Sequence, residues 1–419
     1  GVSYGNSNFV LGAPEFVLRE SFDRYSGHIN EMSEQGYRVL AFAQIGEVPQ
    51  GQPLATHAHL LALVFLTNPI RSSAKETFQF FAKNGVDIKV ISGDNPVTVS
   101  NVALEAGIEG AERYGDARQL VNERAIYEAV DQYTVFGRVT PEQKRMFVKA
   151  LKRHGKTVGM TGDGVNDILA LRDADCSVAM ASGSEAASNA AQLVLMDSDF
   201  SKMPSVVAEG RRVVNNIEKA AILYLTKNIF SLLLAVFSVV NVLSYPLTPS
   251  QITLISMFTI GVPSFVISLE PNKNKIKGTF LGNVFKTAAP AGLTTFISVS
   301  SLVVFGEVFE IESECISTSS TMLVALVGFM ILGKVAKPTN GLHIALITVC
   351  VAGMGYCVFF MPEMFGINSI STQAAMLLVV FLIATEAVFR YVYKFIGLFS
   401  MIGSSRKKEH HRGKNKRRR

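Results

Sequence analysis

The stretch VGMTGDGVNDILALRDAD, residues Val158 to Asp175, joins an apolar run to a polar loop and then to a helical pattern. The loop covers Thr161 to Asp167, and apolar positions at Leu169 and Leu171 follow it. A buried strand that feeds a sharp loop and a helix places ligands at the carboxyl end of a parallel sheet. The sequence therefore predicts an α/β fold with a ligand site at this loop.

Two carboxylates, Asp163 and Asp167, stand four residues apart in this glycine-rich loop. Mg²⁺ in proteins takes one or two carboxylate oxygens together with phosphate oxygens and water, so the pair suits a magnesium ion beside a phosphate group. An acidic turn between a strand and a helix is the plainer interpretation, and for a lone Asp-Gly pair it is the commoner one. The rest of the chain decides between the two.

Apolar residues are unevenly distributed along the 419 residues. Residues 1–210 have an ordinary globular composition, whereas 220–400 contain apolar runs near the length that spans a bilayer, which raises the hydrophobic content to 48%. The net charge is +6, and nine Lys or Arg lie in the last fourteen residues. Such a tail after a membrane domain is typical of an inside-facing anchor, so no nucleic-acid partner is expected.

The apolar half contains six segments that can span a lipid bilayer. Their approximate bounds are 218–243, 247–269, 284–308, 318–336, 341–361 and 371–398. The loops 271–286 and 333–340 and the tail are basic, whereas the alternate loop that contains Glu307 and Glu314 is acidic. By the positive-inside rule this pattern predicts an integral membrane protein whose soluble half and tail lie in the cytosol.

The soluble half changes its pattern at Pro69. Strands around short helices precede this residue, as in an α+β lobe, and alternating helices and strands follow it, as in a doubly wound parallel sheet. Three polar loops, 92–95, 140–144 and 161–167, come where strands meet helices on one edge. They supply a hydroxyl group, backbone N–H groups, a lysine and carboxylates, which are the parts that phosphoryl transfer to or from an acid needs.

These motifs, in this order, resemble those of the P-type cation-transporting ATPases, whose phosphorylation domain is of the haloacid dehalogenase type. The segments that carry the resemblance are Gly12-Ala13-Pro14-Glu15, Gly36-Tyr37-Arg38-Val39-Leu40-Ala41, Asn68-Pro69-Ile70-Arg71, Ser92-Gly93-Asp94-Asn95, Thr140-Pro141-Glu142-Gln143-Lys144 and Thr161-Gly162-Asp163-Gly164-Val165-Asn166-Asp167. The resemblance implies four parts: the carboxyl-terminal part of a nucleotide-binding domain (1–69), a phosphorylation domain (70–212), a transmembrane domain with six helices (213–400) and a basic cytosolic tail (401–419).

The resemblance also implies ATP and Mg²⁺ as cofactors and a role for each matching residue. Asp163 is expected to bind Mg²⁺, Asp167 to orient the phosphorylated site, and Lys144 to balance the charge of the transferred phosphoryl group. The residues expected to hold the phosphoryl oxygens are Ser92, Gly93 and Asn166. The residues expected to contact the nucleotide are Gly12, Ala13, Arg38, Arg71 and Asp94, although Asp94 has an equally good interpretation as a turn-forming residue. Leu11 stands where the family usually has a lysine.

Polar residues inside the spans are candidates for contact with the transported cation, because they are costly in hydrocarbon. They are Thr226, Lys227, Asn228 and Ser231 in the first span and Ser256 and Thr259 in the second. The second pair precedes Gly261-Val262-Pro263, which is expected to break the helix and free carbonyl groups as ligands.

The calcium pumps of the family carry carboxylates where this chain has Ser231 and Ile260. At most one ion is therefore expected, with most of its ligands from helices outside this chain. Lys227 is interpreted either as a substitute for a cation or as a snorkelling or structural lysine, and Glu386 either as a site carboxylate or as a helix-packing residue.

The function implied is ATP-driven cation translocation through an aspartyl-phosphate cycle in a bacterial plasma membrane, with Ca²⁺ as the first choice and Mg²⁺, Mn²⁺, K⁺ or Na⁺ as alternatives. The chain opens on Gly1 and contains neither the Asp-Lys-Thr-Gly nor the Thr-Gly-Glu sequence of the family. We therefore expect a carboxyl-terminal portion, whose partner is the amino-terminal part of the same pump. A membrane-tethered phosphatase would need an Asp-x-Asp motif after a strand, and none is expected; a non-catalytic scaffold would not need Lys144, Asp163 and Asp167.

Overall fold

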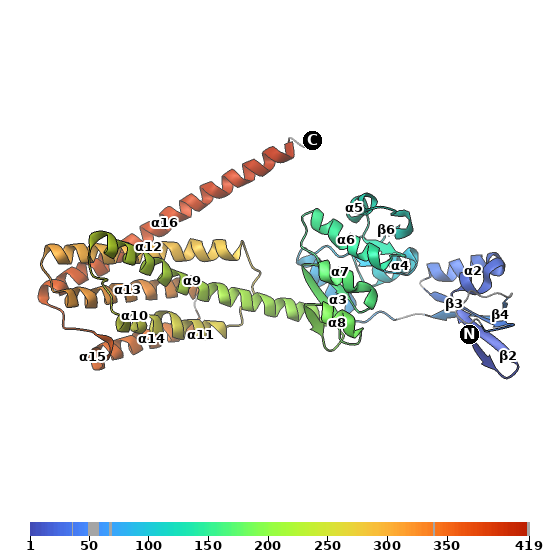
Figure 1. Ribbon diagram of the computed structural model, residues 1–419, viewed down its shortest axis with the longest axis horizontal. Coiled ribbons are helices and arrows are strands. Elements are labelled where there is room, and N and C mark those ends of the chain that lie inside the picture. Colours follow the sequence, from blue (N-terminus) through green and yellow to red (C-terminus); the bar gives the residue numbers. More distant parts are fainter. Residues whose placement is uncertain (36, 49–57, 67–68, 338–339, 417–419) are drawn as a thin grey trace. The chain divides into compact units, whose positions relative to one another are not determined.

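The computed structural model describes residues 1–35, 37–48, 58–66, 69–337 and 340–416, with the backbone alone from 398 onward. The motif residues Gly36 and Asn68 and the last three arginines of the tail lie outside these ranges. The chain forms two compact units, Gly1–Val206 and Val207–Arg419, which are treated separately below (Figure 1).

An antiparallel sheet of four strands, in the order β1-β2-β3-β4, begins the first unit. Its strands are β1 (Val2–Tyr4), β2 (Ser7–Gly12), β3 (Arg38–Ile45) and β4 (His59–Leu66), and its helices are α1 (Pro14–Leu18) and α2 (Phe22–Glu34). Val17, Leu18 and Ile29 of the helices form one buried cluster with Val39 and Ala41 of β3. These strands around short helices agree with the α+β lobe that was predicted before Pro69.

Parallel strands alternating with helices make up the rest of this unit. The elements are α3 (Ala74–Lys83), β5 (Val90–Ile91), α4 (Pro96–Glu105), β6 (Tyr114–Asp116), α5 (Glu123–Gln132), β7 (Val135–Gly137), α6 (Pro141–Arg153), β8 (Gly159–Gly162), α7 (Ile168–Asp173), β9 (Cys176–Met180), α8 (Glu185–Ala190) and β10 (Leu193–Leu195), with short 3₁₀ turns at 117–119, 165–167 and 200–202. All pairings among these strands are parallel, which confirms the predicted α/β fold class.

The parallel strands form two sheets of three, in the orders β5-β7-β6 and β10-β9-β8. Within the described residues, β5 and β8 are therefore edge strands, each with one neighbour. β5 contains only two residues, Val90 and Ile91. Phe136 of β7 and Phe147 of α6 are fully buried, with ring centroids 4.3 Å apart, and they fix α6 against the first of these sheets.

Local signals at Thr140 decide where α6 begins. The Thr140 side chain accepts from the backbone N–H of Gln143 while the Gln143 side chain accepts from the backbone N–H of Thr140, and Pro141 occupies the first helical position. Farther along, Arg145 donates to Asp173 of α7 at 2.7 Å, and this hydrogen bond holds the pKa of Asp173 below its ordinary value. Because that carboxyl group favours its charged form, the pair between α6 and α7 persists to more acidic pH than an isolated aspartate allows.

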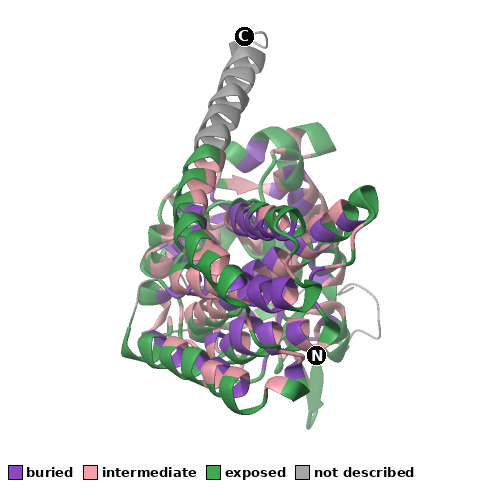
Figure 2. Cartoon of the chain, turned by 90° about the vertical axis from the view of Figure 1, so that its left-hand side faces the viewer, coloured by how far each residue is buried: buried purple, intermediate pink, exposed green. Residues whose placement is uncertain are grey.

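Helices alone form the second unit. They are α9 (Met203–Asn241), α10 (Pro249–Ser256), the π-helical turn η5 (Met257–Gly261), α11 (Val262–Ser268), α12 (Phe280–Val308), α13 (Ser313–Val335), α14 (Gly341–Phe360), α15 (Pro362–Phe365) and α16 (Thr372–Lys416). Within the described residues, six helical segments are long and apolar enough to cross a membrane, as predicted. Their buried residues gather between the helices (Figure 2).

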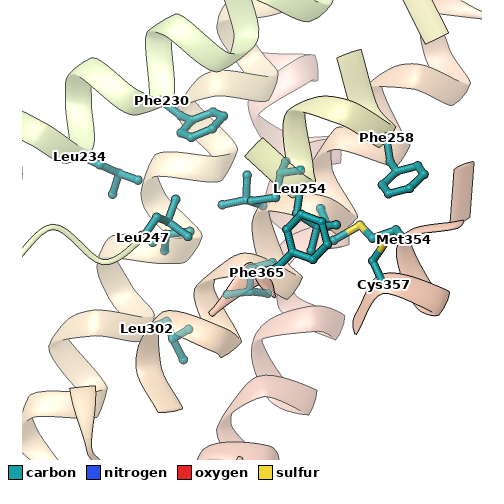
Figure 3. Packing of buried hydrophobic residues seen from close by; sticks show 14 of the residues in the cluster. Phe230, Leu234, Leu247, Leu254, Phe258, Leu302, Met354, Cys357 and Phe365 are labelled. Atoms are coloured by element: carbon teal, nitrogen blue, oxygen red, sulfur yellow. The ribbon is translucent and has the colours of Figure 1, made fainter. Parts of the chain in front are cut away.

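A large apolar cluster fills one part of this unit. Phe230 and Leu234 of α9 meet Leu254 of α10 and Met354 of α14 there (Figure 3). The predicted helix break at Gly261-Val262-Pro263 is wrong: the chain stays helical, and the backbone N–H of Val262 donates to the Met257 carbonyl in a π turn. A π turn accommodates the proline without unwinding, and such turns occur frequently at functional sites.

Candidate functional site

The centre of the soluble site is an ion pair between Lys144 and Asp167. Lys144 lies in the first turns of α6, and Asp167 ends the 3₁₀ turn between β8 and α7. The Lys144 ammonium donates to Asp167 Oδ1 at 2.6 Å, and the two side chains are 15% and 8% exposed. The sequence placed both residues in the site, but it did not predict this direct contact. Because a buried carboxylate without a partner is costly, the contact with Asp167 keeps the positive charge of Lys144 at one defined place.

Asp163 is arranged differently, although it lies in the same loop. Its backbone carbonyl accepts from the N–H of Ser184 at 2.7 Å, and a Cβ on Gly183 would overlap the Asp163 backbone. Its side chain is exposed and has no hydrogen bond or ion pair to another residue of the described chain. The backbone of Asp163 is thus fixed, while its carboxylate has no partner among the described residues. Such a carboxylate suits Mg²⁺, which takes one carboxylate and completes its coordination shell with phosphate and water oxygens. Asn166 is also exposed in this loop.

The loop after β5 brings Ser92, Gly93 and Asp94 to the start of α6. The Ser92 hydroxyl accepts from the Asp94 N–H at 3.2 Å and lies 3.3 Å from Asp94 Oδ2. The carbonyl groups of Ser92 and Asp94 accept from the N–H groups of Val139 and Arg138 at 2.9 and 2.8 Å. These bonds place Asp94 in the turn that follows β5. These bonds join the loop after β5 directly to the residues that precede α6. The sequence predicted that these two loops lie on one edge of the sheet.

The residues predicted to contact nucleotide lie in both parts of the first unit. Gly12 ends β2, Ala13 caps α1, and Arg38 begins β3, so these three lie in the part of the unit that contains the antiparallel sheet. Arg71 belongs to the α/β part, where it donates to the Ser198 carbonyl at 3.2 Å and pairs with Asp199 Oδ1 at 3.4 Å. The guanidinium of Arg71 is thus engaged within the α/β part, and its side chain is 66% exposed.

An Asp-x-Asp sequence does follow a strand, contrary to expectation, at Asp197-Ser198-Asp199 after β10. Asp199 caps the next 3₁₀ turn through Ser201, and these hydrogen bonds lower its pKa. β10 is the far edge of its sheet, two strands from β8 and hence roughly 10 Å from it. Asp199 is thus engaged in capping, and its strand lies two strands from β8, which the loop with Asp163 and Asp167 follows.

A small cavity lies inside the membrane unit, with a volume of about 20 Å³. This volume accommodates about one molecule or ion of the size of water. The polar residues that line it are Thr226 and Lys227 of α9, Ser256 of α10, Thr259 of the π turn and Thr295 of α12. Each threonine hydroxyl donates to a carbonyl one turn earlier in its own helix, which leaves the oxygen lone pairs as acceptors. The cavity can therefore contact a cation through hydroxyl oxygens.

Two of the predicted cation ligands do not reach this cavity. Asn228 is exposed on α9, and the Ser231 hydroxyl lies 3.2 Å from that of Tyr245. Ser256 and Thr259 do line it, as predicted. Sequence reasoning singled out Thr226 and Lys227 as polar residues of the first span but overlooked Thr295 and Gly328. Thr295 and Gly328 lie in helical stretches rich in small and hydroxyl-bearing residues. That composition is the only feature of the sequence that could have indicated them.

Comparisons with known proteins agree with this arrangement. The family model of the haloacid dehalogenase-like hydrolases matches residues 8–175. Calcium-transporting ATPase CtpE of Mycobacterium bovis is 39% identical over 384 residues, which are 86% of this chain and 46% of that relative. A protein of Streptococcus pneumoniae named probable cation-transporting ATPase exp7 is 38% identical over 378 residues, which are 88% of this chain and 48% of that relative. Calcium-transporting ATPase 1 of Saccharomyces cerevisiae is 31% identical over 257 residues, with 59% and 27% covered.

The chain spans about half the length of the two bacterial relatives. The haloacid dehalogenase-like match covers the loops that hold Ser92, Lys144 and Asp163, and the longer similarities extend into the helices of membrane-spanning length. On these grounds the chain belongs to the P-type cation-transporting ATPases.

Proposed function

We propose that this chain is part of an ATP-driven cation pump that works through an aspartyl-phosphate cycle, and that the phosphorylated aspartate comes from an amino-terminal part of the same pump. The observation that carries the proposal is the buried Lys144–Asp167 pair beside the uncommitted carboxylate of Asp163. A fixed positive charge next to a carboxylate that is free for Mg²⁺ suits the stabilisation of a transferred phosphoryl group.

Each residue of the site has a task in this proposal. Lys144 neutralises charge on the phosphoryl oxygens, and Asp167 holds Lys144 in place. Ser92, Gly93 and Asn166 donate to those oxygens, while Asp163 holds the magnesium ion. When bound, Mg²⁺ supplies positive charge that draws electron density from the phosphoryl group.

The two open strand edges support the origin of the missing aspartate. β5 and β8 each have one neighbour in the described chain, and the loops that follow them carry Ser92 and Asp163. A parallel strand paired with either edge would end beside these loops, because the carboxyl ends of parallel strands meet at one sheet edge. An aspartate at the end of such a strand would face Lys144.

ATP is the proposed phosphoryl donor. We assign its contacts to Gly12, Ala13 and Arg38 of the antiparallel sheet and to Arg71 and Asp94 of the α/β part. The proposed domains are accordingly 1–69 for nucleotide binding, 70–212 for phosphorylation, 213–400 for the membrane and 401–419 for the tail. A bacterial plasma membrane, with both soluble domains and the tail on the cytosolic side, fits the basic loops 271–286 and 333–340.

Ca²⁺ is the proposed cargo, because the relatives from Mycobacterium bovis and Saccharomyces cerevisiae are named calcium-transporting. The lining of the cavity includes no carboxylate among the residues that the structure describes. Ca²⁺ takes six to eight oxygen ligands in proteins, so the remaining ligands would come from helices of the amino-terminal part. Asn228, exposed on α9, is available to those helices.

Measurement of ATPase activity in the pump joined to its amino-terminal part tests this function. Ca²⁺ is expected to stimulate hydrolysis and to produce an acid-stable, hydroxylamine-labile phosphoenzyme, whereas Mg²⁺ alone, Mn²⁺, Na⁺ and K⁺ stimulate less. Stimulation by another cation but not by Ca²⁺ would overturn the choice of ion. Hydrolysis without any labile phosphoenzyme would overturn the aspartyl-phosphate cycle.

Substitution of Gly328 by alanine is expected to weaken cation binding. A Cβ at this position would lie 2.7 Å from Cγ2 and 3.2 Å from Oγ1 of Thr259, so the added methyl group narrows the cavity. The cation concentration at half-maximal stimulation should rise several-fold, since overpacking typically costs about 1–3 kcal/mol. Gly333→Ala is the matched control on the same helix, because nothing lies within 4 Å of its added Cβ. Equal cation dependence of the two variants would exclude the cavity as the cation site.

A further inference from the structure

A hollow of about 530 Å³ lies at one end of the membrane unit, where the connection between α11 and α12, residues 269–279, meets α9. Its lining residues are Asn215 and Glu218 of α9, Asn274, Lys275, Ile276 and Lys277 of the connection, and Asn283 of α12. Lys286 is exposed one turn after Asn283 on α12, where residues on adjacent turns are neighbours. Three exposed lysines therefore surround one polar hollow.

Asparagine side chains hold the connection in one shape, although residues 269–279 adopt no regular secondary structure. Asn215 donates to the carbonyl groups of Asn272 and Asn274 at 3.2 and 3.0 Å. Asn283 donates to the carbonyl group of Lys277 at 2.7 Å. These hydrogen bonds fix a backbone that no helix or strand stabilises. The lysines of the connection are thus attached to a preorganised backbone, which lowers the entropy cost of binding a ligand.

The positive charge around this hollow is not balanced within the described chain. No hydrogen bond or ion pair joins the side chain of Lys275, Lys277 or Lys286 to another described residue. One lining residue is acidic, Glu218, and its carboxylate accepts from the Asn283 amide at 3.1 Å. Lysines this close along the chain repel one another, so an anion in the hollow would stabilise their arrangement.

The hollow lies at the depth where lipid headgroups begin. Along α9, Glu218 is roughly 34 Å from the helix end at Asn241, at about 1.5 Å of rise per residue, and the hydrocarbon core of a bilayer is about 30 Å thick. Leu281 and Phe285 of α12 are 78% and 61% exposed, so the first turns of α12 offer an apolar surface to acyl chains. A lipid beside α12 would carry its phosphate group to the level of the lysines.

We propose that this hollow binds the phosphate headgroup of an anionic phospholipid. Lys275 and Lys277 neutralise the phosphodiester group, and Lys286 adds positive charge beside it. The surplus of positive charge selects a lipid with a net negative charge over a zwitterionic lipid, whose headgroup also carries a cation. Lipid binding is measured without ATP, so this inference stands or falls independently of the proposed pump cycle.

Native mass spectrometry of the whole protein released from detergent micelles tests the proposal, because it counts the bound lipids. The wild type should bind its first phosphatidylglycerol about thirtyfold more tightly than its first phosphatidylcholine, since each lysine near an anionic lipid contributes a factor of about five. Lys275→Gln combined with Lys277→Gln should remove most of this preference. Both side chains are exposed, so the double variant is expected to fold.

Two further double variants serve as controls. Lys275→Arg combined with Lys277→Arg keeps both charges and should keep the preference for phosphatidylglycerol. Lys337→Gln combined with Lys394→Gln removes the same amount of charge from exposed lysines that do not line the hollow. This matched control should bind phosphatidylglycerol as the wild type does.

The outcomes separate a lipid site from its alternatives. A loss of preference that is confined to the Lys275→Gln and Lys277→Gln double variant supports the proposal. An equal loss in the matched control would show that the overall surface charge attracts the lipid, and it would overturn the site, as would a wild type without any preference. Inorganic phosphate is added as a competitor: if it displaces phosphatidylglycerol at concentrations similar to those of the lipid, the ligand is a soluble anion and the lipid proposal is wrong.

Discussion

Replacement of Asp163 by asparagine should reduce phosphoenzyme formation from ATP by roughly two to three orders of magnitude, the usual effect of removing one group that stabilises a developing charge. The backbone of Asp163 is fixed by its bond from Ser184, and its carboxylate has no protein partner among the described residues. The substitution therefore removes a magnesium ligand while it leaves the fold almost unchanged. The measurement is incorporation of labelled phosphate at a fixed Mg²⁺ concentration.

Asp197→Asn is the matched control, because Asp197 is an exposed aspartate after a strand of the same unit. Its labelling should equal that of the wild type. Higher Mg²⁺ concentrations should restore part of the labelling in Asp163→Asn if the variant binds the ion weakly. Undiminished labelling in Asp163→Asn would remove Asp163 from the magnesium site.

The second large effect is expected on stability, from Lys144→Met. This substitution leaves Asp167, which is 8% exposed, as a buried carboxylate without its partner at 2.6 Å. Breaking such a pair costs about 3–5 kcal/mol, and the residual exposure of both side chains places this case near the lower value. The expected result is a lower unfolding temperature of the soluble unit in calorimetry of the whole protein, together with loss of phosphoenzyme.

A double variant and a surface variant test this interpretation. Lys144→Met combined with Asp167→Asn removes both charges and should recover part of the lost stability, but not the phosphoenzyme. Lys156→Met breaks the pair of Lys156 with Asp87, whose side chains are 56% and 75% exposed, and it should change stability by less than about 1 kcal/mol. If the two single variants were equally stable, the Lys144–Asp167 pair would have no special structural role.

The parts of the fold that depend on local signals were predicted well. Thr140 and Pro141 mark the start of α6, and this start fixes where Lys144 lies. β9 and β10 coincide with the apolar runs 176–180 and 193–195, and the hydropathy pattern predicted the six helical segments that are long and apolar enough to cross a membrane. These features follow from chain geometry and burial within one segment, so a single sequence contains enough information.

Features that depend on neighbouring segments were not predictable in the same way. Thr226 and Asn228 are two residues apart on one helix, yet only Thr226 faces the cavity. Both are polar, and the inward face of α9 is set by which helices pack against it. Leu169 is 45% exposed while Leu171 is buried, although both were assigned to the apolar face of α7. The contact of Lys144 with Asp167 likewise joins elements 23 residues apart in the chain.

The edge strands β5 and β8 have a consequence for biosynthesis. If a strand from an earlier part of the pump pairs with both β5 and β8, the ribosome makes that strand first. Its second edge then stays unpaired until the roughly 70 residues from Val90 to Gly162 have been made. Contacts of such long sequence separation form slowly. During that delay, two unpaired strand edges could recruit other chains, and we expect the nascent polypeptide to depend on chaperones.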